Sequence, residues 1–479
     1  MNLFCMLLIP LLSIPIVHFA GSRLNEKVGY IASLPPMLGV FQIILLYPSL
    51  LDGEMVLSEI AWVNYLGLDI NFNLSLDGMS LIYAFSISSV SAAVCLYSIK
   101  YMDHRISEMG LEGQERKRAF SRFYAIYLAF YLGMIGAVIS TNVIQFYLFY
   151  EIILISTWLL IHMFGYGEKE RIALIYFIWT HISGVLVLVG FVYHYMESGS
   201  ITIFSYQDLS IASYLLLVGF SVKLAAFGLH TWLPLAHGEA PTPISALLSP
   251  VTIGIGAYGI LRMASPAALE LSPWLSLWAL VTIVYGGLVA LTEDDIKRLL
   301  AYSSISHMGY ILLGIASITY VGTVGVVYHY LTHAFLKAVL FMTAGVIMMQ
   351  LNGVRRISMM GGLATKMPFI AFFLASGFLG LAGFPPFSGF NSKLIIFSGA
   401  FLGAGDPTSL IIVAGAAFSS ILTIAYGAEA IRKSMFGPIR ENLQINKPEV
   451  SMLIPIAAML VLSMVFFFFP WLVLVPMGV

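Results

Sequence analysis

Long apolar runs, separated by short polar connections, cover almost all of the 479 residues. Most runs have about 18 to 25 residues, enough for a helix to cross a hydrocarbon core of about 30 Å. Helices satisfy their backbone hydrogen bonds within the segment, as a bilayer requires. The pattern predicts an all-α polytopic membrane protein with about fourteen transmembrane helices. The expected spans are 3–20, 28–51, 77–99, 123–140, 143–165, 171–195, 211–234, 241–264, 275–292, 300–319, 321–350, 368–387, 388–432 and 452–476, with residues 388–403 alternatively the second half of a broken twelfth helix.

The basic residues predict which side of the membrane each connection faces. Of the 23 Lys and Arg, all but Lys223, Arg262, Lys337 and Lys393 lie in or beside connections that follow odd-numbered spans. The positive-inside rule places these loops in the cytoplasm and both termini on the opposite side of a cell or energy-transducing membrane. The basic loop residues are Arg23, Lys27, Lys100, Arg105, Arg116, Lys117, Arg118, Arg122, Lys169, Arg171, Lys297, Arg298, Arg355, Arg356, Lys366, Arg432, Lys433, Arg440 and Lys447.

Two spans are interrupted by proline and glycine, near Pro234 and near Pro385. Such breaks are tolerated at membrane depth where the freed backbone groups are buried in protein or face a water-filled cavity. Their separation by five spans predicts two inverted five-helix repeats, each with a broken helix near an ion site; a kink or an interfacial turn is the alternative. The expected units are helices 1–3 with a cytoplasmic loop (1–122), the first repeat (123–264), the second repeat (275–432), and a loop with helix 14 (433–479).

Composition narrows the function. The chain is 59% hydrophobic and 10% charged, with a net charge of −1, which fits a membrane protein and gives no sign of a nucleic-acid partner. Cys5 and Cys95 are far apart in apolar sequence. Their spacing fits no metal site, iron–sulfur cluster or redox dithiol, so we expect no cofactor and no metal in this chain.

Glu151 and Lys223 are charged residues placed inside apolar spans. Intramembrane charges are costly and usually belong to ion or proton pathways. If the two residues form a pair at about 4 Å, their attraction is about 4 kcal/mol at an effective dielectric near 20, and separating them would favour release of the lysine proton. A purely structural ion pair is the alternative.

His329, His333 and Lys337 recur every four residues, which places them on one helix face over about 12 Å. Histidine accepts and donates protons near neutral pH, so this spacing predicts a proton relay. Hydrogen bonding to neighbouring helices is the alternative. Lys393 follows the second break and is expected to extend the relay, unless its side chain snorkels to an interface. Weaker relay candidates are His181, His230, His237 and His307, while Arg262 is expected to be an interfacial anchor.

Four sequence motifs carry a resemblance to a known family. They are Phe146-Tyr-Leu-Phe-Tyr-Glu151; Lys223 with His230-Thr-Trp-Leu-Pro234 and Ala240-Pro-Thr-Pro-Ile-Ser245; Asp295-Ile-Lys-Arg-Leu-Leu-Ala-Tyr-Ser303 with Ser306-His-Met-Gly309; and Leu331-Thr-His-Ala-Phe-Leu-Lys337. The chain resembles the antiporter-like subunits of respiratory complex I, Mrp-type Na⁺/H⁺ antiporters and energy-converting membrane hydrogenases. In length it is similar to members without a long lateral helix.

The resemblance implies a charge pair of Glu151 with Lys223, a relay on the later helices and an outward path at Lys393. One position departs. Where many relatives carry a central lysine, this chain has Gly254, so His329, His333, Lys337 or water must bridge the path. The departure favours the archaeal hydrogenase-like branch, and a lysine installed at Gly254 is expected to supply a titratable group near His333.

The resemblance further implies a proton-translocating subunit with no redox or hydrolytic site of its own, in a redox-driven complex. Its partners would be other membrane subunits and a peripheral redox module, and its ions H⁺ and possibly Na⁺. A subunit of an Mrp-type Na⁺/H⁺ antiporter is one alternative. A structural membrane scaffold without a working relay is another.

Overall fold

The structure is a computed structural model that describes all residues except 1, 52–54, 66–67 and 439–447. Arg440 and Lys447, both predicted to be cytoplasmic, lie outside the described residues. The elements are α1 (Phe4–Leu24), η1 (Asn25–Lys27), α2 (Val28–Leu50), β1 (Val56–Tyr65), β2 (Leu68–Leu76), α3 (Gly78–Glu108), α4 (Gly113–Ile139), α5 (Val143–Phe164), α6 (Lys169–Ser198), α7 (Ile211–Lys223), α8 (Trp232–Glu239), α9 (Thr242–Leu247), η2 (Leu248–Thr252), α10 (Ile255–Met263), α11 (Ser265–Glu270), α12 (Ser272–Thr292), α13 (Ile296–Ala316), α14 (Tyr320–Gln350), η3 (Ile357–Met359), α15 (Leu363–Lys366), α16 (Pro368–Ala382), α17 (Gly389–Gly403), α18 (Pro407–Phe418), α19 (Ser420–Met435), α20 (Val450–Phe468), α21 (Trp471–Leu474) and η4 (Val475–Met477).

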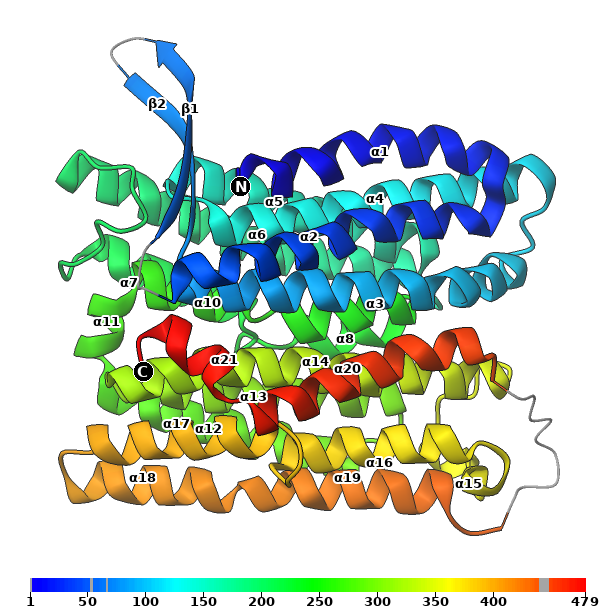
Figure 1. The fold of residues 1–479 in the computed structure, drawn as a ribbon. Coiled ribbons are helices and arrows are strands. Elements are labelled where there is room, and N and C mark those ends of the chain that lie inside the picture. The colour runs from blue at the N-terminus through cyan, green and yellow to red at the C-terminus, as the bar shows by residue number, and fades with distance from the viewer. Residues whose placement is uncertain (1, 52–54, 66–67, 439–447) are drawn as a thin grey trace.

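The fold is a bundle of long helices that run along one common direction (Figure 1). Eleven segments of the described chain are long and apolar enough to cross a membrane. This confirms a polytopic helical membrane protein, while the expected number of about fourteen spans stays a prediction. The α1–α2 and α3–α4 turns and α15 lie at one end, and the β1–β2 hairpin and α11 lie at the other (Figure 1).

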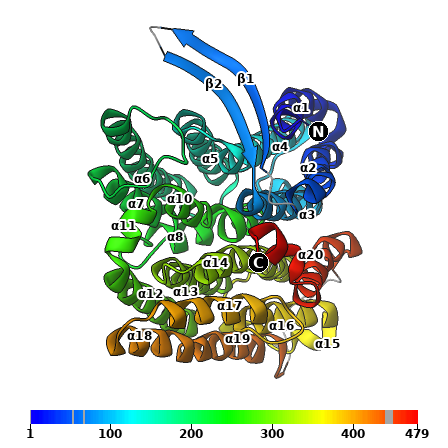
Figure 2. The same ribbon diagram turned by 60° about the vertical axis from the view of Figure 1, so that its left-hand side comes forward.

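Helix α14 forms the centre of the bundle. It packs against α3, α13, α16, α17 and α20, and its most apolar 18-residue window is fully buried. A helix that is apolar around most of its circumference is expected to be buried on all sides. The polar side chains of α14 are therefore enclosed by protein rather than lipid, which sets the position of the site described below (Figure 2).

Two helices are broken as predicted, although one break is displaced. The first lies at residues 224–231, between α7 and α8. Pro234 is the third residue of α8, where the first helical turn tolerates proline because its N–H would have no intrahelical partner. The second break, residues 383–388, contains Pro385. Helix α17 continues α16 beyond it (Figure 1), so 388–432 is not a single span: its first part completes the broken helix, and α18 and α19 follow.

The segment expected as one span over 241–264 is also irregular. It consists of α9, the π-helical turn η2 and α10, and Gly254 is the N-terminal cap of α10. π-Helical turns inside helices are rare and occur often at functional sites. This irregularity lies directly beside α14.

An antiparallel hairpin of β1 and β2 was not predicted. It occupies part of the connection expected between the second and third spans, and it projects from one end of the bundle (Figure 2). The sequence does carry a strand signal, because Leu68-Asp-Ile-Asn-Phe-Asn-Leu-Ser-Leu76 alternates apolar and polar residues.

Candidate functional site

Glu151 lies on α5 and faces α6. An ionisable partner is His181 of α6, with 3.8 Å between the carboxylate Oε2 and the imidazole Nδ1. Gly184 makes room for the carboxylate, since a Cβ there would lie 2.3 Å from the Glu151 Oε1. The side chains of Glu151 and His181 are 20% and 48% exposed in the isolated chain. This part of the site is therefore open at the side of the bundle.

Lys223 is the last residue of α7 and is buried, with 1% of its surface exposed. Its ammonium lies 5.2 Å from the ring centroid of Tyr150. It is not within ion-pair distance of Glu151, so the direct contact expected at about 4 Å is absent. Tyr150, whose hydroxyl bonds to Ser183 at 2.8 Å, is next to Glu151 in the chain and lies beside the lysine. The two charges influence one another through space.

The three residues predicted as a relay on α14 are fully buried and face α13. Lys337 donates a hydrogen bond to the carbonyl of Leu300 at 2.8 Å and another to the hydroxyl of Ser303, both on α13. His333 lies one turn away, and within the described residues neither of its ring nitrogens has a hydrogen-bond partner. Buried polar groups normally have a partner, so these nitrogens, like the hydroxyls of Thr332 and Thr343 on the same helix, still require one.

His307, on α13, joins the α14 residues. Its Nδ1 lies 3.1 Å from Nε2 of His329, and the other nitrogen of His329 lies 3.0 Å from the hydroxyl of Ser392 on α17. The His307 and His333 ring centroids are 5.9 Å apart. His307 was only a weak candidate in the sequence, yet it sits between the other two histidines. A hydrogen-bonded path therefore runs from His307 through His329 to the broken helix α16–α17.

Lys393 lies one residue beyond Ser392 and is also buried. Its ammonium donates a hydrogen bond of 3.3 Å to the carbonyl of Ala382, the last residue of α16. The same ammonium is 4.7 Å from the ring centroid of Tyr310, whose ring is 6.0 Å from that of His329. The second break thus provides a carbonyl acceptor for the lysine.

His237 and His230 differ in their surroundings. His237, on α8, is fully buried and stacks on Phe341, and neither of its ring nitrogens has a hydrogen-bond partner within the described residues. His230 accepts a hydrogen bond from the Gly228 amide at 3.1 Å, and its other nitrogen is 3.2 Å from the Tyr285 hydroxyl. His237 therefore has free bonding capacity near Lys337, whereas His230 is engaged in holding the first break together.

The space at Gly254, where a central lysine was expected in relatives, is filled by Tyr330. A Cβ at Gly254 would lie 2.2 Å from the ring of this tyrosine. The ring stacks on Tyr83 with centroids 3.8 Å apart, and the hydroxyl bonds to the carbonyl of Val251 at 3.1 Å. A lysine at Gly254 would therefore require the Tyr330 ring to move, and its expected role near His333 stays a prediction.

Two basic residues have roles that differ from those expected. Arg262 is not only an interfacial residue, because it binds both carboxylate oxygens of Asp77 at 2.6 Å. Lys297 was placed among the solvated loop cations, but it is fully buried. It donates to the carbonyl of Ala240 at 2.5 Å. Lys297 is followed by Arg298 and lies close to a predicted loop, so its burial could not be predicted from the sequence.

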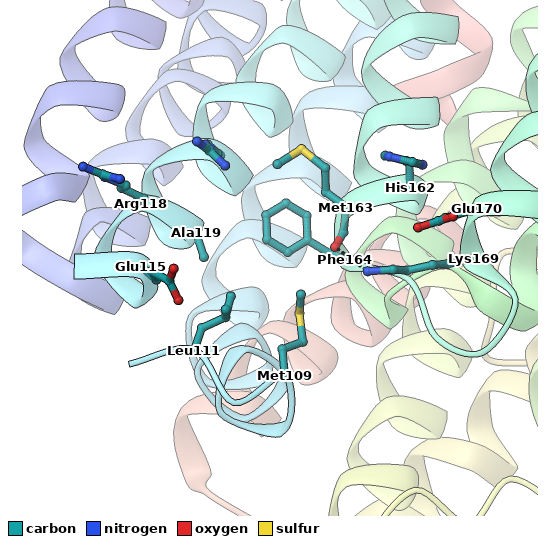
Figure 3. A pocket seen from close by; sticks show the side chains of 11 residues that line it. Met109, Leu111, Glu115, Arg118, Ala119, His162, Met163, Phe164, Lys169 and Glu170 are labelled. Atoms are coloured by element: carbon teal, nitrogen blue, oxygen red, sulfur yellow. Dashed lines mark hydrogen bonds between the residues drawn. The ribbon is translucent and has the colours of Figure 1, made fainter. Parts of the chain in front are cut away.

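A surface pocket of about 420 Å³ lies away from these residues, at the charged ends of α3 to α6 (Figure 3). In Figure 3 the side chain of Lys169 reaches toward the end of α5, where it donates to the carbonyl of Met163 at 3.1 Å. The lining includes acidic side chains, basic side chains and the sulfur atoms of methionines. It is formed by Met109, Leu111, Glu115, Arg118, Ala119, Arg122, His162, Met163, Phe164, Lys169 and Glu170.

A helical membrane bundle with two broken helices and a buried series of Lys and His defines the class of antiporter-like membrane subunits. Comparison with known proteins identifies the family. Residues 140–422, more than half of the chain, match the family described as "NADH:quinone oxidoreductase/Mrp antiporter, TM". Residues 62–124 match "NADH-Ubiquinone oxidoreductase (complex I), chain 5 N-terminus". The chain belongs to the NADH:quinone oxidoreductase/Mrp antiporter family, as its motifs indicated.

Individual relatives are subunits of multisubunit membrane complexes. The chain is 28% identical to F(420)H(2) dehydrogenase subunit M of Methanosarcina mazei, over 91% of this chain and 88% of that protein. It is 32% identical to NAD(P)H-quinone oxidoreductase chain 4 2 of Microcystis aeruginosa, over 80% and 69%. Among solved structures, a chain of the archaeal membrane-bound sulfane sulfur reductase has a TM-score of 0.82 at 25% identity, covering 96% of this chain and 76% of that one. A chain of the Mrp complex from Dietzia has a TM-score of 0.84 at 20% identity, covering 99% and 95%, and shares the fold.

Proposed function

We propose that this antiporter-like subunit translocates protons along its buried titratable groups, in a multisubunit complex driven by a redox partner. The path begins at Glu151 and Lys223 and continues through Lys337 and His333. It then passes His307 and His329 and leaves by Ser392 and Lys393. The observation that carries the proposal is the fully buried contact series of His307, His329 and Ser392, which links α13, α14 and the second broken helix.

The geometry supports stepwise transfer. Histidine has one donor and one acceptor nitrogen when neutral, so His307 and His329 at 3.1 Å can exchange a proton and then reorient. Neither ring nitrogen of His333 has a hydrogen-bond partner in the described part of the chain, and a water molecule is the group that would join it to Lys337 or to His307. Water would also bridge Lys223 and the α14 residues, because no direct side-chain hydrogen bond joins these two groups within the described chain.

The Glu151 region provides a point of control. Because Glu151 lies near Lys223 without touching it, a change in the charge or position of the carboxylate alters the electrostatic energy of a proton on Lys223. The partial exposure of Glu151 and His181 at the side of the bundle supports contact with another membrane subunit there, since charges facing lipid are costly. Such a neighbour could transmit the state of the redox reaction to Lys223.

The proposed complex includes a redox module with its cofactors, because no such module is proposed for this chain. The charged loops are proposed to face the cytoplasm, with both termini on the opposite side. Support for a heteromeric assembly comes from the relatives, which are named as subunits of dehydrogenases and quinone oxidoreductases. Purification of the native complex should recover further membrane subunits and a peripheral redox protein.

The direct test is proton uptake by membrane vesicles that contain the intact complex, followed with a pH-sensitive dye. Glu151→Gln and Lys223→Ala should each lower coupled uptake by at least about ten-fold while assembly is retained. Normal uptake in both variants would contradict the proposed path and favour the alternative that the chain is a structural membrane scaffold. Uptake that requires Na⁺ would identify an Mrp-type exchange instead. Lys433→Ala, which changes a half-exposed lysine in the last turn of α19, is the matched control.

A further inference from the structure

A polar cluster around Lys297 has no place in the path described so far. It lies where α13 begins, beside the end of α8, and is formed by Lys297, Glu239, Asp295, Arg355 and Tyr166. These residues come from four separate parts of the chain. The cluster lies on the side of the bundle with the charged loops, and through α13 it is connected to Lys337.

The surroundings of Lys297 are unusual for a buried lysine. Its ammonium donates to the carbonyl of Ala240 at 2.5 Å and to that of Gly238 at 3.4 Å. Within the described residues, no carboxylate lies within ion-pair distance of it. Asp295 is instead bound to Arg355 at 2.5 Å, and Glu239 to the same arginine at 3.5 Å. Arg105 is the other charged group nearby, so two acidic residues balance two basic ones around the lysine.

A route from solvent reaches this cluster. A hollow of about 50 Å³ at the charged end of the bundle is lined by Tyr166 and Arg355, among other residues. A volume above about 15 Å³ accommodates a water molecule. The ring of Tyr166 lies 5.8 Å from the Lys297 ammonium, and Arg355 holds Glu239, whose side chain is 22% exposed. The Glu239 Oε2 has no hydrogen-bond partner in the described chain.

A route inward also exists. Neither ring nitrogen of His237 has a hydrogen-bond partner within the described residues. His237 precedes Gly238, whose carbonyl lies 3.4 Å from the Lys297 ammonium, and its ring stacks on Phe341, one turn beyond Lys337 on α14. The Leu300 carbonyl that accepts from Lys337 is one helical turn beyond Lys297 on α13, an axial distance of about 4.5 Å. His237 thus adjoins the segment that binds Lys297 and contacts α14 one turn from Lys337.

We propose that Lys297, Glu239 and His237 form the port through which protons from the side of the charged loops load the relay at Lys337. Glu239 receives a proton from water in the hollow and passes it, through a bridging water molecule, to the neutral form of Lys297. The Lys297 Nζ–H bond then breaks as a proton binds a ring nitrogen of His237, which passes it to Lys337; no electrons are transferred. This inference rests on the proposed function, because it assigns the uptake end of the same path.

The alternative is purely structural, since a lysine that donates to the last carbonyls of a helix stabilises its C-terminus. Lys297→Arg separates the two roles. Arginine keeps donors for the carbonyls of Gly238 and Ala240 but does not deprotonate in proteins. The port predicts that proton uptake falls by at least about ten-fold in this variant while assembly is retained. Uptake at the level of the unsubstituted complex would overturn the port. Lys366→Arg, at an exposed lysine of the same side, is the matched control.

A second variant tests the port if arginine at position 297 prevents folding or assembly. Lys297→Ala should lose uptake, and added propylamine, a titratable amine, should restore part of it, whereas guanidine should not. Equal rescue by both compounds, or normal uptake without either, would overturn the port. Lys223→Ala is measured in the same vesicles. If Lys223→Ala blocks uptake while Lys297→Arg does not, only the port fails, whereas normal uptake in Lys223→Ala contradicts the proposed function itself.

Discussion

Gly254→Ala tests the tight packing that replaces the central lysine of the relatives. The added Cβ would lie 2.2 Å from the Tyr330 ring, whereas ordinary contact begins at 3.4 Å, so the ring would have to move by about 1.2 Å (3.4 − 2.2). The φ of Gly254 is −69°, which any residue adopts, so the cost is steric alone. Tyr330 has little freedom to move because it stacks on Tyr83 and bonds to Val251. Overpacking of this kind costs about 1–3 kcal/mol.

The measurement is the temperature at which the purified complex loses its folded size-exclusion peak. Gly254→Ala should lower this temperature by a few degrees. Gly415→Ala is the control, because its Cβ would lie 3.6 Å from Leu280 and alanine favours a helix by up to about 1 kcal/mol. If Gly254→Ala matches this control, the argument from Tyr330 is wrong.

The same packing makes a prediction for transport. In a His333→Ala background, Gly254→Lys alone should not restore proton uptake, because its side chain has no space. Combined with Tyr330→Ala, which removes the ring, the lysine should restore part of the uptake if it can join the path. Restoration by Gly254→Lys alone, with normal assembly, would refute the steric reasoning.

Three further predictions follow from single contacts. His307→Phe should abolish uptake and destabilise the protein by about 1–3 kcal/mol, because it leaves a buried nitrogen of His329 without its partner; vesicle uptake and thermal unfolding measure the two effects. His230→Phe should lower thermal stability but retain uptake, since His230 braces the first break. Burial alone would raise the pKa of Asp77, but the charge and hydrogen bond of Arg262 lower it below its ordinary value; the pair should stabilise the fold above about pH 4, lose that effect as the pH falls through the lowered pKa, and lose it at every pH in Arg262→Gln.

The structural features that were predicted correctly are those that depend on local sequence patterns. Apolar runs gave the helical membrane fold, and the four-residue spacing on α14 gave the shared face of His329, His333 and Lys337. These features depend on residues close together in the chain. The break near Pro385 was also correctly placed, because consecutive prolines and glycines leave few helical conformations available.

Contacts between distant segments could not be predicted in this way. The partner of His329 on α13, the burial of Lys297 and the ring of Tyr330 over Gly254 all depend on how helices pack. The expected contact of Glu151 with Lys223 failed for the same reason, since a shared role does not fix a distance. The displaced first break has a local cause, because a proline can begin a helix as well as end one. The limits of the expected repeats and units stay predictions.

The β1–β2 hairpin has a consequence for the life of this chain in the cell. A two-stranded hairpin is marginally stable by itself in water. Residues 71–74 of β2 are tied to the bundle by Ser140, Thr141 and Asn142, whereas an unpaired strand edge is a template for pairing with other strands. Leu57, Ile60 and Trp62 expose 66%, 53% and 44% of their surfaces on it. Exposed apolar side chains on a strand promote aggregation unless another protein covers them. Synthesis of this subunit would then have to be matched in amount and timing to that of any protein that covers the hairpin.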